Sequence, residues 1–293
     1  MTFLTKEEGQ MESFSMKSSV STPPAVPKSS SITSASLRHH VVSRERIGSG
    51  GRFFPDGVHY IAFFEFLNKQ LAPRTYFEIG TERGHSALAF KCPTVCVDPQ
   101  FKLDVDLLQS RSEIHFFQMP SDVFFANHDL RALFKNGPDI CFLDGMHRCE
   151  YLLRDFFNIE KMCHRRSVIL LHDCLPAYPR MALRTHQLGD ATEGPYQNAW
   201  TGDVWKIVPV LLKFRPDLKL FFIDCAPTGL VLITNLDPDS VILPNQYWNA
   251  VEEMREMDFA STFDDRLFEQ VPILASRSLQ SNPEDLTLFA NFW

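Results

Sequence analysis

The sequence has no long hydrophobic run and no excess of positive charge. No stretch approaches the roughly 18 consecutive apolar residues that a membrane-spanning helix needs, so we expect no membrane partner. The chain of 293 residues has 29 lysine and arginine residues against 36 aspartate and glutamate residues, which gives a formal net charge of −7. A protein that coats nucleic acid needs a basic surface to displace counterions from phosphates. The composition therefore argues against nucleic acid as a partner.

The sequence also lacks a disulfide pattern. Its 7 cysteines form no CxxC pair and have no regular spacing, so we expect reduced, mostly buried thiols rather than a disulfide framework. The first ten residues contain Glu7 and Glu8 and no apolar stretch, unlike a secretory signal. Together these features predict a cytoplasmic protein.

The N-terminal part is poor in apolar residues. Serine, threonine and proline dominate residues 17–36, and too few side chains can be buried there to offset the entropy cost of ordering. We predict a disordered tail over 1–40, a main domain over 41–236 and a helical or irregular C-terminal extension over 237–293. A short basic run, interpreted as a solvated hinge, consists of Arg38, His39, His40, Arg44 and Arg46.

Short runs rich in Val, Ile, Leu and Phe alternate with segments of helical spacing. The runs are 75–79, 94–97, 114–118, 139–143, 167–171, 219–223 and 229–234. This alternation indicates a doubly wound, Rossmann-like α/β fold, in which helices cover both faces of a mostly parallel sheet. Only 5 residues separate the last two runs, too few for a crossover helix, so they predict a terminal antiparallel hairpin. The expected sheet has seven strands.

Helices are predicted between these strands and after them. Their ranges are 57–71, 121–135, 148–163, about 203–214 and 246–257. Residues 174–202 form a long insertion without a regular pattern, and loops of this length are often lids or binding loops.

The segment Glu78-Ile79-Gly80-Thr81-Glu82-Arg83-Gly84-His85-Ser86 joins the first strand to a helix. Gly80 permits a sharp turn, and Gly84 permits close approach of a ligand at the helix start. Backbone N–H groups at that start can hold a carboxylate or phosphate, and Ser86 adds a hydroxyl. Asp98 ends the second strand, where an acid that binds ribose hydroxyls sits in such folds. The combination favours a ligand site over an empty tight turn.

The EIGTERGHS segment resembles motif I of class I S-adenosylmethionine-dependent methyltransferases. It is similar to the version in catechol-type and bacterial small-molecule O-methyltransferases, in which acid-x-Gly-x-x-x-Gly-x-Ser replaces the commoner acid-x-Gly-x-Gly-x-Gly. The resemblance extends through Val97-Asp98-Pro99, 139–147 and 169–173, and covers about residues 55–235. It includes the terminal hairpin, which dinucleotide-binding Rossmann domains lack. It implies an enzyme that transfers a methyl group from S-adenosyl-L-methionine to a small or sugar-containing acceptor, at oxygen.

The resemblance also implies roles for individual residues. The methionine part of the cofactor would be lined by Glu78, Gly80, Thr81, Gly84 and Ser86. Asp98 would hold the ribose, and Ser121 and Asp122 fall where adenine contacts occur. For Ser121, a helix N-cap is the alternative.

Asp144 and Asp173 close the fourth and fifth strands. Neighbouring strands lie about 4.8 Å apart, so these carboxylates can converge as ligands of a divalent metal such as Mg²⁺. In catechol-type enzymes Asn follows the second acid, whereas here Cys174 follows, and a thiol is a poor ligand for magnesium. His147 or His172 could replace that ligand and would favour a transition metal. A site without metal remains an alternative.

His147 offers a route that needs no metal. It lies three residues after Asp144 and could act as a general base near neutral pH, with a surface or helix-capping role as the alternative. His172 is expected to face the opposite side of its strand from Asp173. The predicted catalytic residues are thus Asp144, His147 and Asp173.

Aromatic residues after the fifth strand are candidates for a wall over the acceptor. They are Tyr178, Tyr196, Trp200 and Trp205, with Asp203 among them. For Trp205, helical spacing with Val204, Ile207 and Leu211 favours packing in the core.

Two other functions remain open from the sequence. The DG-x-H and HD patterns are also similar to cephalosporin-hydroxylase-like proteins, so the same fold could carry metal-dependent oxygenase chemistry. A non-catalytic interaction module that keeps the fold is the third hypothesis. Metal analysis separates the first two functions, and a closed cofactor cleft would support the third.

Overall fold

The computed structural model describes residues 35–48, 52–109, 111–186, 196 and 199–288. Contacts divide the chain into residues 1–31 and 32–293, and only the second unit contains described residues. The predicted disordered tail therefore lies outside the described residues up to position 34.

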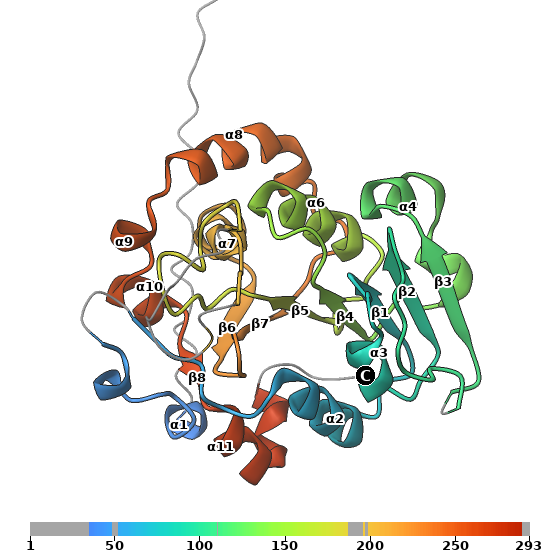
Figure 1. The fold of residues 1–293 in the computed structure, drawn as a ribbon, viewed down its shortest axis with the longest axis horizontal. Coiled ribbons are helices and arrows are strands. Elements are labelled where there is room, and N and C mark those ends of the chain that lie inside the picture. Colours follow the sequence, from blue (N-terminus) through green and yellow to red (C-terminus); the bar gives the residue numbers. More distant parts are fainter. Residues whose placement is uncertain (1–34, 49–51, 110, 187–195, 197–198, 289–293) are drawn as a thin grey trace, which may run out of the picture. The chain divides into compact units, whose positions relative to one another are not determined.

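One sheet organises the described part of the chain (Figure 1). Its eight strands follow the order β3-β2-β1-β4-β5-β7-β6-β8. They are β1 (Tyr76–Ile79), β2 (Thr94–Asp98), β3 (Ile114–Gln118), β4 (Ile140–Leu143), β5 (Val168–His172), β6 (Lys219–Ile223), β7 (Leu230–Thr234) and β8 (Ile273–Leu274). Only β7 is antiparallel to its neighbours, β5 and β6. The Rossmann-like α/β prediction and the antiparallel hairpin are confirmed. The count of seven strands is wrong, because β8 pairs with β6.

Helices surround this sheet. The α-helices are α1 (Ala35–Arg38), α2 (Tyr60–Leu71), α3 (His85–Ala89), α4 (Ser121–Asn127), α5 (Leu130–Leu133), α6 (Cys149–Glu160), α7 (Ile207–Phe214), α8 (Ile242–Glu256), α9 (Phe259–Thr262), α10 (Asp265–Gln270) and α11 (Ser276–Ser281), with 3-10 turns η1 (Arg44–Arg46), η2 (Val204–Lys206) and η3 (Pro283–Leu288). The predicted helix 121–135 is interrupted, because the Asp129 side chain accepts a hydrogen bond from Arg131 N and starts α5. No helix among the described residues is long and apolar enough to cross a membrane.

Two apolar layers fill the space between the sheet and its helices. Alternate residues of a strand point to opposite faces, so Phe77 and Ile79 of β1 join one layer while Tyr76 joins the other. Figure 1 shows α6, α7 and α8 over the first face and α2 and α11 over the second. Trp205 is 1% exposed in the first layer, which confirms its predicted core packing. All seven cysteines are free and buried, as predicted.

The segments before α2 and after β7 meet at the β6 edge of the sheet. Leu274 of β8 forms a bridge with Val41, and Val42 N donates to Ile273 O at 2.8 Å. The domain boundaries at 40 and 236 stay a prediction from sequence. These contacts join residues on both sides of position 236 to the same sheet.

Arg215, which follows α7, is a buried cation that links α6 to α7. It is 1% exposed and donates to the Glu160 carboxylate at 2.6 and 2.9 Å. Removing the cation leaves the buried Glu160 carboxylate with the Asp237 N–H at 3.1 Å as a donor but with no positive charge beside it. Arg215→Met should therefore lower the free energy of unfolding by about 3–5 kcal/mol in urea denaturation.

The matched control is Arg266→Met. Arg266 is 78% exposed and pairs with Asp264, so its loss should cost less than about 1 kcal/mol. The double variant Arg215→Met/Glu160→Gln should recover part of the stability, because it removes both charges. Equal losses for the two arginines would contradict this account.

Asp139 is a buried carboxylate directly before β4 that makes a pH-dependent contribution to stability. Burial alone would raise its pKa, but hydrogen bonds from His164 and Arg74 lower it to about 2. The pKa of an unfolded aspartate is about 3.9, so the charged form favours the folded state above that pH and loses the advantage between about pH 4 and 2.

Asp139→Asn should therefore cost about 2 kcal/mol at pH 7, with the difference from the parent chain shrinking below pH 4. Denaturant titrations of both chains at pH 7 and below pH 4 measure this difference in the free energy of unfolding. Asp129→Asn, at an exposed carboxylate paired with Arg131, is the control with a small effect at pH 7. A constant cost for Asp139→Asn down to pH 2 would count against the assignment.

Candidate functional site

The turn from β1 to α3 depends on two glycines in the left-handed region. Gly80 has φ +87°, and a Cβ there would lie 1.9 Å from the Asp144 carbonyl oxygen. Only glycine lets this turn lie against the end of β4. Gly84 also has φ +87°, and the space beside its Cα is filled by apolar side chains of residues 103–107. Both glycines are thus explained by backbone conformation and close packing, and the predicted ligand role of Gly84 stays untested.

Glu78 of β1 is fully buried beneath this turn. Tyr76 Oη donates to Glu78 Oε2 at 2.8 Å, and burial raises the pKa of the carboxyl group. Glu78 Oε1 and Thr81 Oγ1 form no hydrogen bond of normal geometry within the described residues, although the Thr81 and Ser86 hydroxyls lie close enough to Glu78 to oppose the rise of its pKa. Ser86, on α3, is 6% exposed. Buried polar atoms are normally hydrogen-bonded. Glu78 Oε1 and Thr81 Oγ1 can therefore each form a further hydrogen bond with a polar group of a ligand.

Asp98 ends β2 against the same turn. Its Oδ2 accepts from Glu82 N at 2.9 Å, and its Oδ1 accepts from Gln100 N at 2.7 Å. The carboxylate therefore lies beside the predicted cofactor loop and is 7% exposed. Each carboxylate oxygen can accept a second hydrogen bond, which leaves capacity for ribose hydroxyls.

Ser121 and Asp122 begin α4. Pro120 holds the cap position without a side-chain bond, so the N-cap alternative for Ser121 is not observed. Asp122 forms an ion pair with Arg154 at 2.6 Å. Their adenine role stays a prediction. Nearby Asp155 of α6 is buried, burial raises its pKa to about 7, and its Oδ1 lacks a partner in the described chain.

Four ionisable side chains meet where β4 and β5 end. His147 Nε2 lies 3.3 Å from Asp173 Oδ2 and 3.7 Å from Asp144 Oδ1. His172 Nδ1 lies 3.2 Å from Asp144 Oδ1 and 3.5 Å from Asp173 Oδ1. The predicted meeting of the carboxylates is therefore observed. We call Asp144, His147, His172 and Asp173 the strand-end cluster.

The expectation that His172 points away from Asp173 is wrong. Asp173 has φ +60°, in the left-handed region, so the side-chain alternation of β5 ends before it. Asp144 and His172 then lie on one side, and Asp173 turns towards both. The positive φ had no signal in the sequence.

The charges of the cluster depend on one another. Burial would lower the pKa of His147, but the Asp173 and Asp144 carboxylates raise it to about 9. Despite burial, the same carboxylates raise the pKa of His172, and the two imidazoles lower that of Asp144. Near neutral pH the isolated cluster thus holds His147 as an imidazolium, which donates rather than accepts a proton. His147 can act as the predicted base only when a further positive charge offsets the negative charges of the Asp144 and Asp173 carboxylates.

Two aromatic residues border the cluster. Tyr60, at the start of α2, has its ring centroid 4.4 Å from that of His172, and burial raises the pKa of its phenol. The phenol thus stays a neutral donor. Trp200 stacks on His147 with centroids 5.0 Å apart, and its carbonyl lies 2.9 Å from His147 Nδ1. Sequence reasoning missed Tyr60, because only the tertiary fold brings α2 to β5.

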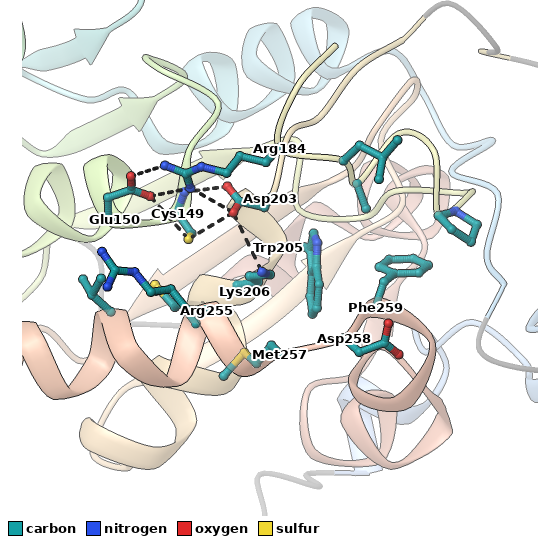
Figure 2. Close-up of a pocket in the computed structure, with 15 residues that line it drawn as sticks. Cys149, Glu150, Arg184, Asp203, Trp205, Lys206, Arg255, Met257, Asp258 and Phe259 are labelled. Carbon is teal, nitrogen blue, oxygen red and sulfur yellow. Dashed lines mark hydrogen bonds and ion pairs between the residues drawn. The ribbon is translucent and has the colours of Figure 1, made fainter. Parts of the chain in front are cut away.

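A cavity of about 560 Å³ lies between the first turn of α6, η2 and the segment joining α8 to α9 (Figure 2). Figure 2 shows Glu150, Arg184 and Asp203 paired on one side and Trp205 and Phe259 on another. Asp203 and Trp205, two candidates for an acceptor wall, both line this cavity, although helical spacing favours core packing for Trp205. The predicted wall residues Tyr178 and Tyr196 pack together in a separate apolar cluster.

Comparisons with known proteins give limited similarity. No protein-family model matches the sequence, and no curated protein matches it. The SAH-bound methyltransferase PaMTH1 of Podospora anserina has 16% identity over 61% of this chain and 78% of its own, with a TM-score of 0.44. The O-methyltransferase from Bacillus cereus in complex with SAH has 15% identity over 68% and 84%, with a TM-score of 0.41. TomG, an O-methyltransferase from Streptomyces achromogenes in complex with SAM, has 11% identity over 60% and 79%, with a TM-score of 0.43. At these values the function has to be argued from the site itself.

Proposed function

We propose that this protein is an S-adenosyl-L-methionine-dependent methyltransferase that acts on an oxygen of a small or sugar-containing acceptor. One observation carries the proposal: Asp98, Glu78 and the strand-end cluster lie in a row along the carboxyl ends of β2, β1, β4 and β5. Ligands of open α/β sheets bind at this edge. In this proposal Asp98 binds the ribose at one end of the row, and the strand-end cluster acts on the acceptor at the other end.

The buried oxygens beneath the β1 turn fit the methionine part of this cofactor. Glu78 Oε1 and Thr81 Oγ1 form no hydrogen bond of normal geometry in the described chain and can bind its ammonium group, while Asp98 holds the ribose. Gly80, Gly84 and Ser86 complete the turn, and Ser121 and Asp122 are assigned to adenine. When bound, the cofactor supplies a methyl group on a positively charged sulfur that an oxygen nucleophile can attack in line. The chain contributes by holding the two reactants in position.

Asp144, His147 and Asp173 are assigned to the reacting oxygen. A divalent metal would be held by Asp144, His172 and Asp173, whose ligand atoms all lie within 4.8 Å of one another. A nitrogen ligand beside two carboxylates suits a transition metal better than magnesium. A cation there would offset the carboxylate charge that raises the pKa of His147 and so favour the form of His147 that accepts a proton.

The cavity beside α6 is assigned to the non-reacting part of the acceptor. Cys149, two residues after His147, lines it, and Asp203 Oδ1 accepts from Cys149 N at 3.0 Å. Its apolar side and its ion pairs suit an acceptor with both a ring or alkyl part and polar groups.

The test is calorimetry of the purified chain with the cofactor and with its demethylated product. We expect micromolar binding of both, and no detectable binding would reject the proposal and favour a non-catalytic module. An acceptor screen that detects the demethylated product then identifies the substrate. Metal analysis separates the alternatives, because redox-active iron with oxygen consumption would indicate an oxygenase instead.

A further inference from the structure

Three groups of side chains in the described chain have the composition of a metal site. The first, within the strand-end cluster, belongs to the candidate site. In the second, the Arg184 guanidinium already pairs with Glu150 and Asp203. The third consists of His39, His40 and Asp285, and has no ion pair with lysine or arginine within the described residues. We call it the terminal triad.

The donor atoms of the terminal triad converge on one point. His39 Nε2 lies 3.1 Å and His40 Nε2 lies 3.0 Å from the same oxygen, Asp285 Oδ2. In a tetrahedral zinc site with ligands at about 2.0–2.2 Å, neighbouring ligand atoms are roughly 3.3–3.5 Å apart. The two nitrogen–oxygen distances therefore need to open by only a few tenths of an ångström to admit an ion, and all three ligand atoms lie within 4.8 Å of one another.

His40 is held in the orientation that a ligand needs. Its side chain is fully buried, and its Nδ1 lies 2.7 Å from Ser278 Oγ, while its backbone carbonyl accepts from Ala275 N at 2.8 Å. Metal-binding histidines typically use the second ring nitrogen in such a bond, which fixes the first on the metal. The interpretation of this residue as part of a solvated hinge is therefore wrong. His39 is 50% exposed, which leaves an entry path and room for a water ligand.

We propose that the terminal triad binds a zinc ion or a similar divalent transition metal, with water completing the coordination. Two imidazoles and one carboxylate suit this class of ion. With neutral imidazoles the triad carries a single negative charge, and each ring that binds the ion through Nε2 carries its proton on Nδ1, which in His40 faces Ser278 Oγ. The ion links His39 and His40, which follow α1, to Asp285 of η3. Leu37 of α1 and Leu286 of η3 are already buried.

The experiment titrates zinc into the metal-stripped full-length chain by calorimetry and follows thermal unfolding. Parent, His39→Gln and Asp285→Asn chains are compared, in the natural background and with Asp144→Asn/Asp173→Asn to remove the other cluster. His115→Gln is the matched control, because His115 is a partly exposed histidine bonded to one carboxylate, Glu113, at 2.6 Å. His39 is half exposed, so its replacement should leave the fold intact.

We expect the parent to bind one more zinc equivalent than His39→Gln or Asp285→Asn in either background. Loss of a direct ligand should lower the affinity at least about 100-fold in both variants, so that the site no longer fills at the zinc concentrations that saturate the parent. In the Asp144→Asn/Asp173→Asn background, zinc should raise the unfolding temperature only when the triad is intact. Unchanged stoichiometry in His39→Gln, an equal loss in His115→Gln, or no binding tighter than roughly 100 µM would overturn the proposal. None of these outcomes depends on methyl transfer.

Discussion

Replacing Asp173 by asparagine is expected to lower the turnover of the acceptor about 10²- to 10³-fold while leaving cofactor affinity nearly unchanged. Asp173 Oδ2 lies 3.3 Å from His147 Nε2, and its Oδ1 lies 3.5 Å from His172 Nδ1, so the change removes a charge that acts on both imidazoles. Asparagine has the same size and tolerates the φ of +60° at this position. The measurement is the rate of formation of the demethylated cofactor, with calorimetry for binding.

Asp106→Asn is the control for this result. Asp106 is an exposed acid whose side chain accepts from Leu108 N, and its replacement should leave turnover within about twofold, as for ordinary surface changes. Near-parental turnover in Asp173→Asn would contradict the assignment of the strand-end cluster to the reaction. So would a loss of cofactor affinity as large as the loss of turnover.

Asp98→Asn should weaken cofactor binding about 30- to 100-fold. The carboxylate already holds the backbone at Glu82 and Gln100, and an amide can accept on one side only. The variant therefore loses a charged acceptor for ribose and one restraint on the loop. Hydrogen bonds to charged groups are worth about 1.5–3 kcal/mol each, or about 12- to 140-fold in affinity, and the expected loss lies within this range.

Asp104→Asn provides the comparison for this variant. Asp104 lies on the same loop and pairs with Arg83 and His85 on the surface, so its loss should change cofactor affinity less than about threefold. Calorimetry with the demethylated cofactor measures both chains without knowledge of the acceptor. Equal dissociation constants for the parent and Asp98→Asn would remove the ribose assignment.

Much of the sheet follows from local sequence. Each of the first seven strands is a largely apolar run closed by a turn residue, which predicts a covered sheet without knowledge of the neighbours. The edge strand β3 is the exception to burial on both faces, because Phe116 is 39% exposed. The strand β8 has only two residues, Ile273 and Leu274, and its pairing with β6 depends on how the C-terminal segment returns to the sheet. The helix α8 starts at Ile242, before the predicted 246, because Pro244 is tolerated in a first turn.

Part of the candidate site could likewise be predicted from the sequence, and part could not. Asp144 and Asp173 were predictable neighbours, because the carboxyl ends of parallel strands meet at one edge. The inclusion of His172 depends on a single positive φ, and that of Tyr60 on the packing of α2. The same holds for Asp155, which no local pattern distinguishes from a surface acid of α6. Tertiary contacts define these residues, so periodicity alone does not reveal them.

The bridge between Val41 and Leu274 sets a limit on how this protein can be shortened. A chain trimmed to 41–236 would lose β8 and leave β6 as an open edge with free N–H and C=O groups. Such an edge is a template for pairing with another molecule. We would expect a fragment of that kind to self-associate during purification even though every strand of its Rossmann-like core is present.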